Sequence, residues 1–368
     1  MHWSVLAAVA VSPFVALGAA IGLGHAQSPD GQRISGPFVH ENLAVYFIHG
    51  KSAPGNVPLT LEEAMAKGVV KVRETSNVNQ LEIENLGLDE VFVQSGDIVK
   101  GGKQDRTLMV SLLLPPHSGA IPIASFCVEQ GRWTPRGRED ARSFSTASAS
   151  VPSRELKLAM KAPVPAVPTP EALSADPSRH PASGSSTAAA ETGARQMRVW
   201  ESVRATQNNL SDNLGAQVRS MQSASSLQLA LESEKLLDAQ KGYIDALLGA
   251  GERDDAIIGF IFAVNGEINS ADIYPSNGLF RKMWPKLLKA SAIEAIGHRN
   301  APAVAPPSAE AAEAFLRAAE SGKSSERTPA AGVRLETREG ERAYLFETAR
   351  LGSASAPGAW VHRNYLAK

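Results

Sequence analysis

The densest group of residues that could do chemistry is the segment QSGDIVKGGKQDR at residues 94–106. Its glycines permit positive φ angles, so several backbone amides could converge on an anion. Its lysines and arginine would supply positive charge, and its aspartates could orient those cations or transfer protons. Two tight turns with solvated charged side chains are the alternative. The candidate ligand-binding residues are Gly96, Lys100, Gly101, Gly102, Lys103, Gln104 and Arg106, and the candidate catalytic residues are Asp97 and Asp105.

This segment differs from a nucleotide-binding P-loop. In a P-loop, Lys follows the second glycine and a helix begins, whereas here Gly102 follows Gly101 and a strand is expected from Thr107. The sequence also lacks HExxH, GxSxG, GxGxxG and EF-hand motifs, so it gives no support for zincin, α/β-hydrolase, dinucleotide-binding or calmodulin-type chemistry. We therefore expect no cofactor.

A second group of polar residues is SFCVEQGRW, which ends at Trp133. In a strand, Cys127 and Glu129 would project to the same face. Arg132 could bind a carboxylate or phosphate through two hydrogen bonds, with Trp133 as a wall beside it, and Glu129 is a third candidate acid or base. A structural Arg–Glu pair is the alternative. Cys127 has no neighbouring His to activate it, so we expect a buried small side chain instead of a nucleophile.

The histidines are scattered and predict no metal site by their spacing. His40, His49, His117 and His298 lie far apart in the sequence, so the fold would have to assemble any such site. The single cysteine excludes an internal disulfide and any multi-cysteine metal centre.

Composition and charge indicate a globular protein with a small polar partner. Hydrophobic residues make up 43% of the 368 residues, which is enough for a substantial core. The 37 basic and 38 acidic residues leave a net charge of −1, which argues against nucleic acid or an acidic membrane as the main partner. We expect a small molecule or a peptide.

The N-terminal segment predicts export. Residues 1–26 contain no Lys, Arg, Asp or Glu, and an apolar run from Val5 to Leu23 precedes Gly24, His25 and Ala26. This pattern is typical of a secretory signal peptide cleaved after Ala26, giving a periplasmic or extracellular protein without a membrane span. An uncleaved anchor is the alternative, because the run approaches the roughly 20 residues that span a bilayer.

Short β-rich segments dominate the first part of the chain and predict a largely antiparallel sheet, because the gaps between them are too short for parallel crossovers. One helix is expected at residues 59–67. The expected strands are 43–49, 69–73, 81–85, 91–94, 107–114 and 119–128.

Residues 143–194 are rich in Ala, Ser and Pro and are expected to form mainly a surface loop, broken by a weak helix at 154–161. Further helices are expected at 196–206, 227–248 and 279–295, with a kink or restart at Pro285. Asn265-Gly266 predicts a type I′ hairpin over 257–274 in which Asp272 faces Gly259. That pairing would leave room for a ligand beside Asp272, although solvation of a strand end is the favoured reading.

The C-terminal part is expected to form a linker at 301–307, a helix at 310–320 and a hairpin at 333–350, with Trp360 and Tyr365 holding the terminus to the core. We therefore expect a signal peptide (1–26), a single α+β domain (36–300) and a small C-terminal extension (301–368).

Taken in order, QSGDIVKGGKQDR, FCVEQGRW, Gln196 with Val199 and Trp200, GFIFAVNGEINSADIY and LFRKMWPKLL resemble the ARG and rhodanese-phosphatase-superfamily-associated protein domain family over about residues 36–300. The resemblance implies no established activity. It implies one domain interrupted by the Ala/Ser/Pro-rich loop. It also implies a shared site around Asp97, Lys100, Gln104, Asp105, Arg106, Glu129 and Arg132.

The sequence is compatible with three functions. The first is binding of a polar or anionic small ligand by the Gly-rich segment and its cations. The second is a hydrolase or transferase that uses Asp97, Asp105 or Glu129 as acid or base while Arg132 stabilises negative charge. The third is a structural envelope protein whose motifs only fix turns.

Overall fold

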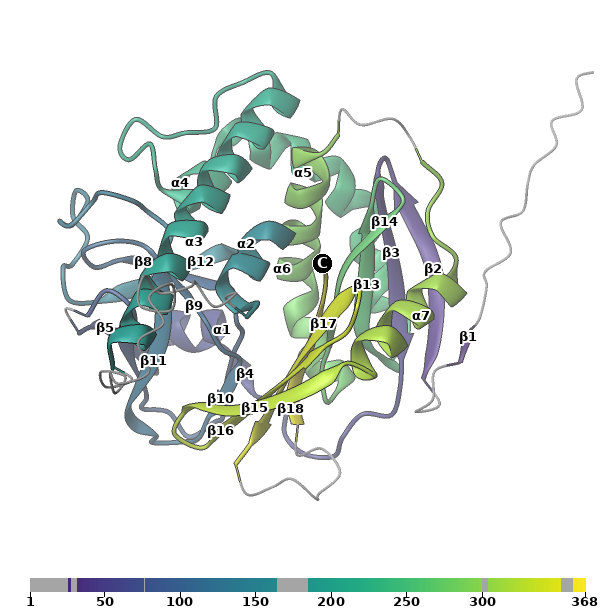
Figure 1. The fold of residues 1–368 in the computed structure, drawn as a ribbon, viewed down its shortest axis with the longest axis horizontal. Coiled ribbons are helices and arrows are strands. Elements are labelled where there is room, and N and C mark those ends of the chain that lie inside the picture. Colours follow the sequence, from purple (N-terminus) through teal and green to yellow (C-terminus); the bar gives the residue numbers. More distant parts are fainter. Residues whose placement is uncertain (1–25, 28–31, 76, 164–184, 300–303, 352–359) are drawn as a thin grey trace, which may run out of the picture.

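A computed structural model describes residues 26–27, 32–75, 77–163, 185–299, 304–351 and 360–368. Residues 1–25 of the expected signal peptide and residues 164–184 of the Ala/Ser/Pro-rich stretch lie outside these ranges. The expectation of a surface loop is wrong for residues 144–150, which form a strand, and for residues 185–194, which begin a helix. In the described part, strands form three sheets, and helices cover the faces of the largest one (Figure 1). The α+β class is therefore confirmed.

The largest sheet joins both ends of the described chain. Every neighbouring pair in it is antiparallel. Its strands, in spatial order, are β1 (Ala26–Gln27), β2 (Arg33–His40), β3 (Leu43–His49), β13 (Ile257–Val264), β14 (Glu267–Ile273), β18 (Trp360–Ala367), β17 (Ala343–Arg350), β16 (Val333–Glu339) and β15 (Lys323–Ala330). Because β18 pairs with β14, the expected C-terminal extension is instead an integral part of this sheet.

Two smaller sheets come from residues 59–150. One contains β10 (Leu112–Leu114), β7 (Val91–Val93) and β4 (Leu59–Thr60), and β4 and β7 are parallel. The other contains β12 (Phe144–Ser150), β8 (Asp97–Gly101), β9 (Arg106–Leu108), β11 (Gly119–Cys127), β6 (Gln80–Asn85) and β5 (Val70–Glu74). The expected strand at 107–114 is divided between β9 and β10, and β8 and β12 were not predicted.

The helices are α1 (Leu61–Ala66), α2 (Arg154–Lys161), α3 (Ser185–Leu214), α4 (Leu227–Leu231), α5 (Glu234–Leu247), α6 (Asn277–Gly297) and α7 (Ala309–Glu320), with a 3₁₀ turn η2 (Leu248–Glu252) after α5. Helix α6 runs unbroken through Pro285, so the helix does not restart there. Pro285 is exposed, and water can satisfy the carbonyl group that loses its helical partner there. Among the described residues, no helix combines the length and the apolar character needed to cross a lipid bilayer.

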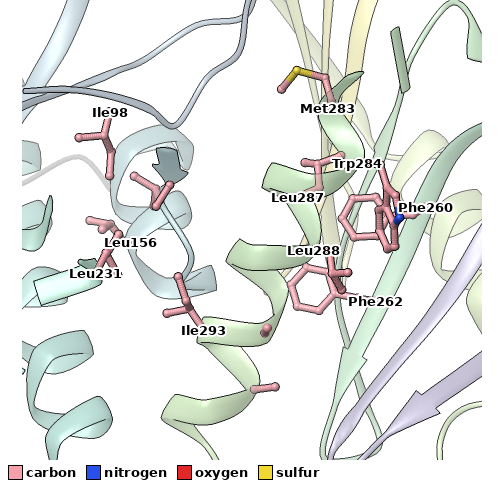
Figure 2. Close-up of a cluster of buried hydrophobic side chains, with 14 of the residues drawn as sticks. Ile98, Leu156, Leu231, Phe260, Phe262, Met283, Trp284, Leu287, Leu288 and Ile293 are labelled. Carbon is pink, nitrogen blue, oxygen red and sulfur yellow. The ribbon is translucent and has the colours of Figure 1, made fainter. Parts of the chain in front are cut away.

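Strand β3 explains how the core is divided. All seven of its residues are buried, because its side chains alternate between two covered faces of the sheet. Val45 and Phe47 belong to the core that includes α6, whereas Tyr46 and Ile48 belong to the core that includes α7. In Figure 2, Trp284 and Leu288 of α6 lie against Phe260 and Phe262 of β13. Helix α6 thus packs between the sheet and the other helices.

The hairpin of β13 and β14 forms as expected near its turn, where Val264 pairs with Glu267. A β-bulge then places Asn269 as an extra residue, because Ala263 pairs with Ile268 but Phe262 pairs with Ser270. The predicted pairing of Asp272 with Gly259 is therefore wrong. Asp272 pairs with Phe260.

Candidate functional site

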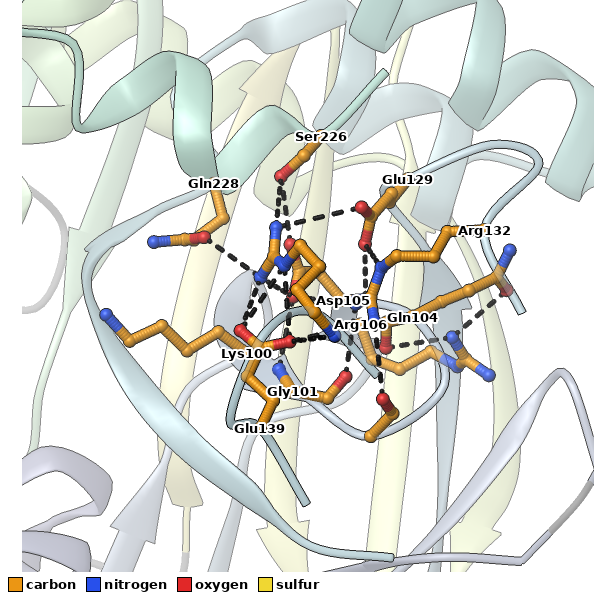
Figure 3. Close-up of polar contacts among 12 residues, drawn as sticks. Lys100, Gly101, Gln104, Asp105, Arg106, Glu129, Arg132, Glu139, Ser226 and Gln228 are labelled. Carbon is orange, nitrogen blue, oxygen red and sulfur yellow. Dashed lines mark hydrogen bonds and ion pairs between the residues drawn. The ribbon is translucent and has the colours of Figure 1, made fainter. Parts of the chain in front are cut away.

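The Gly-rich segment encloses an anion of its own, the carboxylate of Asp105 (Figure 3). The Gly101 amide donates to Asp105 Oδ1 at 3.1 Å, and the Ser226 hydroxyl donates to Oδ2 at 2.9 Å. Arg136 Nη2 lies 2.8 Å from Oδ1. Asp105 itself is completely buried. The Gly101 amide comes from the Gly-rich segment, but the cations paired with this anion are Arg132 and Arg136, whereas Lys100, Lys103 and Arg106 were predicted. The anion also belongs to the protein itself.

Glu129 is a second buried carboxylate in the same network. It accepts a hydrogen bond of 3.1 Å from the backbone amide of Asp105. Arg132 Nε lies 2.7 Å from Glu129 Oε2, and Arg136 Nη1 lies 3.7 Å from Oε1. Two buried carboxylates therefore share two arginines. We call Asp105, Glu129, Arg132, Arg136 and Glu139 the arginine–carboxylate network.

Burial raises the pKa of Asp105 to about 6, and the negative charge of Glu129 acts in the same direction. Arg136 and the hydrogen bonds from Gly101 and Ser226 oppose this rise. Removal of the Asp105 carboxylate from water therefore raises its pKa more than its hydrogen bonds and ion pair lower it. Asp105 changes its protonation state in a pH range that is accessible to proteins in solution.

The side chains of Arg106 and Gln104, in the Gly-rich segment, are buried in the protein interior. Arg106 is completely buried and donates from Nη1 to the backbone oxygen and to Oε1 of Gln104, at 3.1 and 3.2 Å. Its Nη2 lies 3.5 Å from Glu74 Oε2. Arg106 therefore cannot reach a ligand that approaches from solvent.

Cys127 is buried, as its sequence surroundings predicted. Its thiol donates to Gln104 Oε1 at 2.9 Å, and burial raises its pKa to about 11. The side chain of Gln196 in α3 makes two hydrogen bonds to the Cys127 backbone. It accepts from the amide and donates to the carbonyl oxygen, both at 2.9 Å. These contacts explain how two segments far apart in the sequence belong to one structural unit.

The remaining predicted site residues lie elsewhere. Asp97, the first residue of β8, pairs with Lys286 of α6 at 2.7 Å. Lys100 pairs with Glu232 at 3.3 Å, and Lys103 lies 5.1 Å from the ring centroid of Trp133. Gly96 and Gly102 both have positive φ angles, as turns require. They shape the backbone, and the amide of Gly102 donates to the carbonyl oxygens of Asp140 and Ser143, both at 3.1 Å.

A hollow of about 940 Å³ opens on the outer side of the network. Arg132, Arg136 and Glu139 contribute to its lining, together with Gln222 and Ser223. Arg136 Nη2 lies 2.9 Å from Glu139 Oε1, and Arg132 Nη1 lies 3.6 Å from Glu139 Oε2. Arg136, Glu139 and Ser226 were not predicted as site residues. No motif marks them, although the sequence RGRED at residues 136–140 shows a local concentration of charge.

A second polar group, which the sequence did not predict, lies between the sheets. We call Ser111, Lys161, Asp272, His362 and Asn364 the central polar cluster. His362 Nδ1 lies 3.0 Å from the Ser111 hydroxyl, and its Nε2 lies 3.1 Å from Asp272 Oδ1. Asn364 donates to Asp272 at 2.8 Å and accepts from Lys161 at 2.7 Å.

Burial is the largest effect on the pKa values of His362 and Lys161 in the central polar cluster. It lowers the pKa of His362, although Asp272 opposes the change, and it lowers the pKa of Lys161 to about 7. Ser, His and Asp are the residue types of a hydrolase triad. However, the two cavities that adjoin the cluster have volumes of about 10 and 20 Å³, which is room for about one water each. The described structure offers no space for a substrate there.

Comparison with known protein families shows which family the chain belongs to. Residues 31–366 match the ARG and Rhodanese-Phosphatase-superfamily-associated Protein domain. The chain belongs to this family. No curated protein and no solved structure gave a match. The resemblance in the motifs is therefore confirmed, and the matched region extends beyond the expected residues 36–300.

The extent of the family domain agrees with the largest sheet. The match includes β15, β16 and β17 and nearly all of β18, and these strands complete the sheet that begins with β2 and β3. His362 and Asn364 of the central polar cluster also lie within the family domain. Membership of this family alone implies no activity for the chain.

Proposed function

We propose that the protein binds a small anionic molecule, a carboxylate or a phosphate, in the hollow beside Arg132 and Arg136. The observation that carries this proposal is the position of the two guanidinium groups, which lie between buried carboxylates on one side and an open hollow on the other. A guanidinium group can hold a planar carboxylate or a phosphate through two parallel hydrogen bonds.

Asp105 and Glu129 act as positioning residues in this proposal. Both are completely buried, so they fix the inner edges of Arg132 and Arg136 without meeting the ligand. A bound anion gains more from cations that are already held in place, because less side-chain entropy is lost. The same burial argues against either carboxylate as the acid or base of a hydrolase acting in the hollow.

Glu139 occupies the position that the ligand would take. Its side chain is 28% exposed, whereas those of Arg132 and Arg136 are 9% exposed. Burial raises the pKa of Glu139, but the hydrogen bond and charge of Arg136 outweigh this effect and hold the pKa below its usual value. Glu139 is thus an ionised carboxylate at neutral pH, and an external anion would displace it from the arginines.

The experiment is a calorimetric titration of the protein with inorganic phosphate and with succinate. Wild-type protein should bind at least one of them weakly, because Glu139 competes. Glu139→Gln should bind about tenfold more tightly, since the amide cannot form an ion pair, and Arg136→Lys should bind more weakly. Glu326→Gln is the matched control, because Glu326 of β15 also pairs with an arginine but does not line the hollow.

Two results would contradict the proposal. One is an absence of binding by wild-type and Glu139→Gln protein alike. The other is binding that neither Glu139→Gln nor Arg136→Lys alters. If alanine substitutions around the hollow lower the melting temperature and no anion raises it, the network has a structural role.

We also propose that the mature protein is exported. The support is the uncharged, apolar N-terminal segment that ends in small residues before Gln27. N-terminal sequencing of the protein from cells should give a chain that starts at Gln27, and a chain that starts at Met1 would refute this.

A further inference from the structure

We infer that Glu155, Glu294 and His298 form a binding site for one divalent transition-metal ion. Each of the three side chains offers one ligand atom, and these atoms all lie within 4.8 Å of one another. The group is separate from the arginine–carboxylate network and from the central polar cluster. It lies where the first turn of α2 meets the C-terminal end of α6.

The two helices explain why the side chains converge. Glu294 and His298 are four residues apart, and this spacing places them on the same face of α6, one turn from each other. Glu155 is the second residue of α2, after the N-cap Ser153. The backbone of His298 is held at the helix end, since its carbonyl oxygen accepts 2.9 Å from the side chain of Asn265.

Hydrogen bonds from neighbouring residues hold the Glu294 carboxylate in a fixed orientation, as is usual for carboxylates that bind metal ions. Glu294 is 4% exposed, and its Oε1 accepts from the Arg154 amide at 3.1 Å and from Asn269 Nδ2 at 3.0 Å. Asn269 is the extra residue of the β-bulge in β14, so the bulge supplies this contact. Among the described residues, Oε2 of Glu294 has no hydrogen-bond partner, which leaves it available for an ion.

Space for an ion and its water ligands adjoins the three side chains. Glu155, Glu294 and His298 line a cavity of about 50 Å³ together with polar groups that include Ser202 and Thr206. One water needs only about 10–15 Å³ of such space. The Glu155 side chain is 52% exposed and can rotate toward an ion, which would compete with its 3.4 Å ion pair to Arg154.

The donor set selects the class of metal. One imidazole nitrogen with two carboxylate oxygens suits Zn²⁺ or Mn²⁺, whereas Ca²⁺ and Mg²⁺ prefer oxygen ligands throughout. Three protein ligands leave at least one coordination position for water. Arg154 pairs with Glu155, and a divalent ion would supply the positive charge that both carboxylates can bind.

The test is a calorimetric titration of chelator-treated protein with ZnCl₂ and with MnCl₂. We expect one ion per chain for at least one metal, and a higher melting temperature in its presence. Glu155→Gln should weaken binding at least tenfold, and His298→Gln should do the same. Because Glu155 is exposed, its variant should fold, which circular dichroism checks.

Glu310→Gln is the matched control. Glu310 is also the second residue of a helix, after the N-cap Ser308 of α7, but it lies outside the proposed site. This variant should bind the ion as wild type does. Either an absence of binding at 1 mM metal, or stoichiometric binding that Glu155→Gln and His298→Gln leave unchanged, would overturn the inference.

Discussion

The ammonium group of Lys286 lies 2.7 Å from the carboxylate of Asp97, and both side chains are at least 90% buried. Asp97 begins β8 and Lys286 belongs to α6, so this ion pair joins the six-stranded sheet to the helix that covers the largest sheet. Oδ2 of Asp97 also accepts from the Gln94 amide at 2.9 Å.

Lys286→Met should lower the free energy of unfolding by about 3–5 kcal/mol, because it leaves the buried Asp97 charge without its partner. Urea denaturation measures the change. Lys241→Met is the control, since Lys241 pairs with Asp238 where both are largely exposed, and it should cost less than about 1 kcal/mol. Equal effects of the two variants would refute the prediction.

Asp105→Asn should become more stable relative to wild type as pH rises from about 4 to 6. The pKa of Asp105 in the folded protein is raised to about 6, above its unfolded value, so in this range the folded protein keeps a proton that the unfolded chain releases, and wild type loses stability as pH rises. The difference should grow by at most about 1.4 kcal/mol per pH unit. Urea denaturation at several pH values tests this. A difference that shrinks with rising pH would mean that attraction to Arg136 outweighs burial.

Lys161→Met should be more stable relative to wild type at pH 7 than at pH 10. Burial lowers the pKa of Lys161 to about 7, so between pH 7 and 10 the unfolded chain binds more protons and wild type gains stability with rising pH. The advantage of the variant should therefore fall by at most about 1.4 kcal/mol per unit. The exposed Lys71→Met serves as control. A pH-independent difference would contradict the expected titration.

Gly251→Ala should lower the free energy of unfolding by about 1–3 kcal/mol. A Cβ atom there would lie 2.4 Å from Trp284 Nε1, and this indole cannot move without losing its 2.8 Å hydrogen bond to the Leu248 carbonyl. Gly249→Ala, in the same 3₁₀ turn, meets no atom within 4 Å and should change stability by less than about 1 kcal/mol. Thermal denaturation of both variants checks the contrast.

Much of the fold could be predicted because local patterns and packing agree. The buried run that became β3, the Asn265-Gly266 turn and the apolar face of α6 all follow from residue type and spacing. Strands β8 and β12 could not be predicted in this way. Gly101 lies so close to β12 that a Cβ atom there would be 3.1 Å from the Ser143 carbonyl oxygen. Glycine and other small residues favour the prediction of a loop, so the sequence alone did not indicate these two strands.

The sequence predicted only those residues of the candidate site that lie within the two polar motifs. Asp105, Glu129 and Arg132 meet as the motifs suggested, but Asp97, at the start of β8, pairs with Lys286 of α6. Arg136 supplies the shortest ion pair to Asp105, and no spacing rule marks it. The central polar cluster draws on residues from Ser111 to Asn364, which only the completed fold brings together.

The order of strands in the largest sheet has a consequence for synthesis on the ribosome. Strand β3 lies between β2 and β13, and β13 begins at Ile257, long after β3 ends at His49. The growing chain therefore carries a hydrophobic strand with one unpaired edge until the second half emerges. We expect the nascent protein to need protection from aggregation throughout that interval.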